Sequence, residues 1–257
     1  MLIAISQVVY LGAFSVFFHP TPDRWEGSHG YSMLAMTFVE TGTFSTASRP
    51  PLYPVFLAAI IRVAGKNWLW PAILAQSGLS LICGTMLVWF CVRCLRNPLA
   101  AWLMALLYAS HIHLNIENLA QRETVLFCVL FVLLLFALYR ARGSRGYAAT
   151  GAIAGLLYLT RPTGTVVLAM LMLILLYQWR RIPPRKLVGA GASLLLAFFV
   201  VTLPWNLLVL RNFGDVRLLP SSTNGENLFK GNTPALDGIY PYVDVDLYNP
   251  WIADFTA

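Results

Sequence analysis

Long apolar runs separated by short polar stretches dominate the hydropathy pattern of the chain. Seven runs are typical of membrane helices: residues 1–18, 68–92, 98–112, 124–139, 147–160, 163–179 and 188–209. Several are shorter than the roughly 20 residues that cross a bilayer unaided. The run 52–63 is shorter still and contains Arg62, so it is not counted as a span. The pattern therefore predicts an all-α, polytopic membrane protein with about seven transmembrane helices.

The segment GYSMLAMTFVETGTF, between the first two spans, has the spacing of an amphipathic helix. Its apolar residues Tyr31, Leu34, Ala35 and Phe38 recur at intervals of three to four, and Gly42 stands where a helix would end. Such a helix lies in the membrane interface and does not span the bilayer. We therefore expect interfacial helices in the loop between the first and second spans.

The motif SRPPLYP at 48–54 follows this helix and leads into an apolar run. Proline has no N–H donor and disfavours the helical conformation in the residue before it. Pro50 and Pro51 are therefore expected to open a helix or hold a rigid loop. Arg49 keeps its charge at any biological pH, so it is either a membrane-surface arginine or a ligand for an anion.

Charge supplies the topology that run length leaves open. The chain is 58% hydrophobic and 11% charged, with a net charge of +7. Three short connectors, 93–96, 140–145 and 180–186, are basic and carry no acid, which is typical of cytoplasmic loops. By parity, every acidic residue then lies on the outer side. The basic excess therefore indicates topology, and it excludes nucleic acid as a partner.

The same topology gathers polar side chains that are unusual in a membrane protein on the outer side. They are Asp23, Glu26, His29, Arg49, His113, Glu123 and Arg161, together with the segment after Trp205. Isolated charges at bilayer depth are costly, so we expect an outer-face cavity that holds acids and arginines together. Two alternatives remain: separate snorkelling by each arginine, and an acid favoured at a helix N-terminus by the helix dipole for Glu123.

The order and spacing of several motifs resemble a known enzyme family. These are GYSMLA, GTFS, RPPLYPVFLA, RETVLF, LTRPTG, PWNLLVLRN and STNGENLFKGN, within residues 23–240. The chain resembles the GT-C membrane glycosyltransferases of the protein-mannosyltransferase and aminoarabinose-transferase type (family 39-like). The resemblance implies a GT-C fold in the bacterial plasma membrane. It also implies transfer of a sugar from a polyprenyl-phosphate carrier, a membrane lipid, to a lipid, glycan or protein acceptor at the periplasmic face.

The resemblance also implies roles for individual residues. It points to Asp23 first and Glu26 second as the catalytic acid of the outer loop, because Gly27 interrupts the family's D-x-x-x-Y pattern before Tyr31. Glu123 matches the second acidic position. Arg49, Arg161 and Arg211 match the basic positions that face the carrier phosphate. Supporting or acceptor-binding roles fall to His29, Tyr31, His113 and Asn212, and a divalent metal ion, if one is used, to Asp23 and Glu123.

These residue types suit the implied chemistry. Arginines stabilise the charge that develops on a leaving phosphate, a carboxylate takes the proton of the acceptor, and paired carboxylates bind divalent cations. The alternative function is a transporter or lipid flippase, which would keep ionisable residues at the bilayer midplane. The predicted spans contain no Asp, Glu, Lys or Arg.

The predicted organisation has four parts. They are a first transmembrane helix (1–18), an outer loop with the catalytic acid (19–67), a helix bundle (68–209), and an outer-side segment (210–257) that we expect to be truncated relative to the longer family members.

Overall fold

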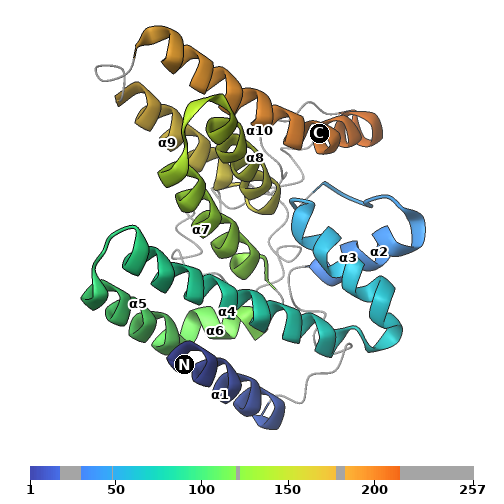
Figure 1. Cartoon of the computed structure of the whole chain (residues 1–257). Helices are drawn as coiled ribbons and strands as arrows, with labels where there is room; N and C mark the ends of the chain where they lie inside the picture. The colour runs from blue at the N-terminus through green and yellow to red at the C-terminus, as the bar shows by residue number, and fades with distance from the viewer. Residues whose placement is uncertain (18–29, 48, 120–121, 178–182, 215–257) are drawn as a thin grey trace, which may run out of the picture.

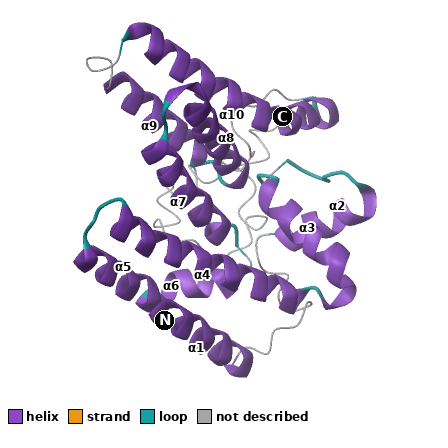
Figure 2. Ribbon diagram, in the orientation of Figure 1, coloured by secondary structure: helices purple, strands orange, loops and turns teal. Residues whose placement is uncertain are grey.

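The computed structural model describes residues 1–17, 30–47, 49–119, 122–177 and 183–214. All regular secondary structure in this part of the chain is helical; helices joined by short loops make it up, and it contains no strand (Figure 2). The helices are α1 (Leu2–Phe17), α2 (Tyr31–Thr41), α3 (Leu52–Ala64), α4 (Leu69–Arg93), α5 (Pro98–Ser110), α6 (Ile112–Leu119), α7 (Thr124–Arg140), α8 (Gly143–Thr160), α9 (Gly164–Tyr177) and α10 (Pro184–Phe213). A short 3-10 turn, Gly65–Asn67, joins α3 to α4.

Each of the seven predicted apolar runs forms a helix, which confirms the all-α prediction. By length and composition, α4 and α10 are able to cross a membrane, with 25 and 30 residues. The apolar helices α1, α5, α7 and α9 are shorter than 18 residues. Seven spans therefore stay a prediction. The predicted run 98–112 ends earlier than expected, because the backbone leaves the helical conformation at His111 (ψ 87°) before α6 begins.

Helices α8 and α10 form the closest helix pair, and two glycines permit their approach. A methyl group at Gly151 would overlap the carbonyl oxygen of Leu194, and one at Gly155 would lie 3.0 Å from Val201 Cβ. Two small residues four positions apart are a common helix interface inside membranes, because they let the backbones pack closely. Leu157 and Leu194 are fully buried in the core that this pair builds.

A second group consists of α1, α4, α5 and α6, which lie side by side in Figure 1. Buried polar contacts join its members. The Gln7 amide of α1 donates to Asn115 Oδ1 of α6 over 2.6 Å, and the Tyr108 hydroxyl of α5 donates to the Ser80 carbonyl of α4 over 2.9 Å. The first contact holds α6 against α1, and the second holds α5 against α4.

Helices α2 and α3 lie between α1 and α4 in the chain, where interfacial helices are predicted, and they pack against each other. Both ends of α2 carry glycines in the left-handed conformation: Gly30 at φ 72° and Gly42 at φ 71°, whose N–H donates to the Phe38 carbonyl. The predicted apolar face of α2 is buried, which confirms the amphipathic helix. Helix α3 begins directly after Pro51, as the motif SRPPLYP predicts.

Candidate functional site

Four side chains from distant parts of the sequence lie close together, and we call them the charged cluster. They are Tyr31 at the start of α2, Arg49 before α3, Glu123 just before α7 and Arg161 just after α8. Arg161 Nε lies 3.4 Å from Glu123 Oε1. The Arg49 guanidinium carbon lies 5.7 Å from the centre of the Tyr31 ring. Tyr31 lies close enough to Glu123 for the negative charge of the carboxylate to raise the pKa of the Tyr31 hydroxyl. The cluster therefore holds one carboxylate, two cations and one phenol.

The Glu123 carboxylate is mostly buried, and its neighbours compensate its charge. Its side chain is 13% exposed, whereas that of Arg161 is 43% exposed. Burial raises the pKa of Tyr31 well above its usual value, and the negative charge of Glu123 raises this pKa further, although Arg49 and Arg161 oppose the shift. Tyr31 therefore remains a protonated hydrogen-bond donor at physiological pH.

Glu123 directs its carboxylate into the cluster and does not cap its own helix. It is the residue before α7, and its carbonyl accepts the first helical hydrogen bond, from Phe127 N–H over 2.9 Å. Its side chain makes no capping hydrogen bond, although an acid at this position commonly bonds to the first-turn N–H groups. This geometry favours a role in the site over a helix-dipole role alone.

Backbone hydrogen bonds hold Arg161, and a ring contact orients Arg49. Arg161 follows α8, where its N–H donates to the Leu157 carbonyl, and its own carbonyl accepts from Gly164 N–H over 2.9 Å. A methyl at Gly164 would meet the backbone of Tyr158, so only glycine fits this turn. Arg49 precedes the buried Pro50 and contacts Tyr31 through a cation–π interaction, which further orients its guanidinium.

The remaining predicted site residues lie apart from this cluster or outside the described residues. Asp23, Glu26 and His29 belong to the undescribed range 18–29, and the His113 side chain is likewise outside the described set. Arg211 and Asn212 are exposed in the last turn of α10. Within the described residues, no group of three His, Cys, Asp or Glu side chains could hold a metal ion. The predicted metal pair Asp23 and Glu123 stays a prediction.

Two residues near the cluster were not predicted from the sequence. The ring of Tyr53 in α3 packs edge-on against Tyr31, with centroids 5.0 Å apart. The Gln76 Nε2 of α4 donates to the Arg122 carbonyl over 3.1 Å and so braces the turn that carries Glu123. Gln76 is an amide within a long apolar run, and such a residue at membrane depth is itself a signal of a polar contact.

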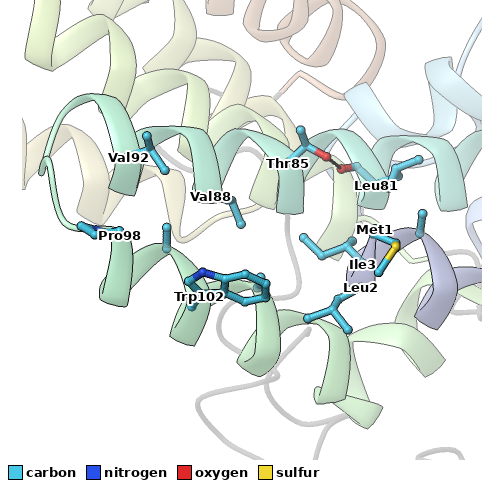
Figure 3. Close-up of a pocket in the computed structure, with 12 residues that line it drawn as sticks. Met1, Leu2, Ile3, Leu81, Thr85, Val88, Val92, Pro98 and Trp102 are labelled. Atoms are coloured by element: carbon cyan, nitrogen blue, oxygen red, sulfur yellow. Dashed lines mark hydrogen bonds between the residues drawn. The ribbon is translucent and has the colours of Figure 1, made fainter.

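A cavity of about 610 Å³ lies away from the charged cluster, between α1, α4 and α5 (Figure 3). Apolar side chains such as Leu2, Val88 and Trp102 line it. The Thr85 hydroxyl at its wall already donates to the Leu81 carbonyl over 2.7 Å. None of the predicted site residues lines it, so this cavity offers no groups for acid–base or phosphate chemistry.

Comparison with known proteins gives one family. The sequence profile of the dolichyl-phosphate-mannose-protein mannosyltransferase family matches residues 48–205. The matched range contains Arg49, Glu123 and Arg161, and therefore three of the four residues of the charged cluster. No curated protein and no solved structure matches the chain.

Proposed function

The chain belongs to the dolichyl-phosphate-mannose-protein mannosyltransferase family, and on that premise we propose that it transfers a sugar from a polyprenyl-phosphate carrier to an acceptor at the outer face of a membrane. Membership makes the protein a membrane glycosyltransferase, and the apolar helices α4 and α10 fit this class. The donor, the acceptor, the orientation and the residue roles given below are the proposal.

The observation that carries the proposal is that Arg161 pairs with the Glu123 carboxylate while Arg49 lies over the ring of Tyr31 beside it. The ion pair of Arg161 with Glu123 measures 3.4 Å, longer than the 2.7–2.9 Å typical of a tight charge-assisted hydrogen bond. Arg161 is partly exposed, so its guanidinium has donors left for another anion. We assign this anion as the carrier phosphate, bound between Arg161 and Arg49.

Glu123 is then the group that receives the acceptor's proton. In the transfer, the bond from the anomeric carbon to the phosphate oxygen breaks, and a bond from that carbon to the acceptor oxygen or nitrogen forms. The proton of the acceptor moves to a carboxylate, and polyprenyl phosphate leaves with its charge balanced by the arginines. Tyr31 keeps the Glu123 carboxylate oriented. Asp23 and Glu26 remain candidates for the same role or, with Glu123, for holding a divalent cation.

The proposed orientation places the charged cluster outside the cytoplasm. Glu123 immediately precedes α7, and Arg140 ends this helix, so the cluster and the basic connector 140–145 lie at opposite ends of α7. Since basic connectors of this kind stay in the cytoplasm, the cluster faces the periplasm in a bacterial plasma membrane. Arg211 is assigned to the same face, at the end of α10.

The direct test is sugar transfer by membranes that contain the protein. A radiolabelled polyprenyl-phosphate sugar is supplied, and labelled product is measured with the wild type, with Glu123→Gln, and with Asp23→Ala combined with Glu26→Ala. We expect the wild type to transfer label and the first variant to lose most of the activity. Uptake of the sugar into proteoliposomes without any new glycosidic product would instead identify a transporter.

A further inference from the structure

Buried polar atoms without a partner lie next to the charged cluster. Tyr53 Oη and Gln76 Oε1 accept or donate no hydrogen bond within the described part of the chain. Tyr53 is 0% exposed and Gln76 is 1% exposed. A buried polar group that lacks a partner costs stability, and native structures usually satisfy such groups with protein, water or ligand. The two atoms therefore require a partner.

Contacts place both residues beside Glu123, from two directions. Tyr53 packs in one buried cluster with Tyr31, Ala72 and Ile73, and the negative charge of Glu123 raises the pKa of both Tyr31 and Tyr53. Gln76 lies three and four residues after Ile73 and Ala72, so it shares their face of α4. Its amide nitrogen holds the carbonyl of Arg122, the residue before Glu123.

The amide of Gln76 has a fixed orientation, because Nε2 is already committed to the Arg122 carbonyl. Its Oε1 is then free to accept, and the hydroxyl of Tyr53 is free to donate. A donor on α3 and an acceptor on the face of α4 that carries Ala72 and Ile73, which belong to the same buried cluster as Tyr53, suit a hydroxyl group, which accepts from Tyr53 and donates to Gln76. Neither atom carries a charge, so this position suits a neutral group better than a phosphate.

We propose that Tyr53 and Gln76 form a binding site for a single hydroxyl group beside Glu123, filled either by a water molecule or by a hydroxyl of the sugar or acceptor. Both sources present the same chemistry, an oxygen that donates once and accepts once. The site itself stands without any catalytic activity, whereas its use by a substrate rests on the proposed function. Tyr53 and Gln76 are then residues that bind and position the hydroxyl relative to the Glu123 carboxylate.

The first arm of the test measures thermal stability without substrate. Tyr53→Phe removes the hydroxyl alone, and Tyr139→Phe does the same at an exposed ring, which makes it the matched control. If water fills the site, Tyr53→Phe lowers the Tm of the purified protein by about 2–4 °C. Tyr53→Phe combined with Gln76→Leu then lowers it by less than the sum of the two single variants.

The second arm measures transfer kinetics with the same variants. If a substrate hydroxyl fills the site, Tyr53→Phe leaves the Tm unchanged and raises KM for that substrate by roughly tenfold. The proposal is overturned if Tyr53→Phe raises or keeps the Tm and also leaves KM and kcat unchanged. A wild-type protein without transfer activity contradicts the proposed function alone. In that case a lowered Tm still supports the site, and an unchanged Tm overturns it.

Discussion

Helices α7 and α8 carry arginines at both ends of the pair, and the surroundings of these arginines differ between the two ends. At one end, Glu123 and Arg161 form an ion pair beside the buried Tyr31. At the other end, about 25 Å along the 17 residues of α7, Arg140 and Arg142 are exposed. There Arg140 rests over the ring of Trp89, with its guanidinium carbon 5.7 Å from the ring centre.

This difference separates two uses of arginine in a membrane protein. The connector arginines are solvated and lie beside an aromatic ring of the kind enriched at membrane interfaces, so they suit an anchoring role that requires no ligand. The cluster arginines are partly buried: Arg161 is held by a turn and pairs with Glu123, and Arg49 lies over the ring of Tyr31. Their arrangement suits an anion that binds and dissociates. The predictions below test this contrast.

The largest expected effect is on transfer after Glu123→Gln. The amide keeps the shape of the side chain but neither accepts a proton nor balances Arg161, so we expect transfer to fall by about 10²–10⁴-fold. Glu40→Gln is the matched control, because Glu40 is an exposed acid at the far end of α2. Initial rates of label transfer measure both. Equal rates for the two variants would remove Glu123 from the site.

Truncation of the cluster arginines is expected to weaken use of the donor. Arg49→Ala or Arg161→Ala removes a charge-assisted contact to phosphate, so KM for the polyprenyl-phosphate sugar rises by about 10–100-fold. Arg140→Ala, at the connector end, leaves KM unchanged. Arg49→Lys recovers only part of the loss, because an ammonium cannot reproduce the planar guanidinium. A similar KM for the Arg49→Ala and Arg140→Ala variants would erase the contrast between the two ends.

A substitution at Gly151, where α8 meets α10, tests the packing of the helix that leads to Arg161. Gly151→Ala places a methyl against the Leu194 carbonyl, and overpacking of this kind destabilises by about 1–3 kcal/mol. We expect a lower Tm and a lower yield of folded protein in detergent. Gly78→Ala is the control, since nothing lies within 4 Å of the added carbon. An unchanged Tm for Gly151→Ala would mean that α8 and α10 pack less closely than described.

The smallest effect is expected at alkaline pH. The pKa values of Tyr31 and Tyr53 are both raised above the ordinary tyrosine value of about 10. Burial is the larger cause, and the negative charge of Glu123 is the second. Above that pH the folded state keeps protons that the unfolded chain releases, so stability is full below about pH 10 and falls as the pH rises further. Tyr31→Phe should flatten this fall in a Tm-against-pH series. A profile identical to that of the wild type would contradict the buried phenol.

The sequence predicted the helices well and the contacts between them poorly. Apolar runs identify helices because every backbone group in a membrane must be bonded within its own segment. Helix α6 was missed, because its sequence IHLNIENL is polar and follows a break at His111 that no proline or glycine marks. Its place is set by the contact of Asn115 with Gln7, which are 108 positions apart in the chain.

The site was predicted in the same uneven way. Charge parity and motif resemblance identified Arg49, Glu123 and Arg161, because arginines and acids are rare in so apolar a chain. Tyr53 lies within the motif SRPPLYP, but only tertiary packing brings it to Tyr31, so the sequence gives no sign of its place beside the cluster. Gln76 was missed because its partner is a backbone carbonyl 46 positions away, and no side-chain pattern reports such a contact.

Binding of polyprenyl phosphate without its sugar tests the central claim most directly. The affinity of the purified protein for this lipid is measured for the pair Arg49→Ala with Arg161→Ala and, as the control, for the pair Arg140→Ala with Arg142→Ala. The account predicts that the first pair weakens binding at least tenfold while the second leaves it unchanged. Equal losses in the two pairs, or a larger loss in the second, would contradict the assignment of the charged cluster as the phosphate site.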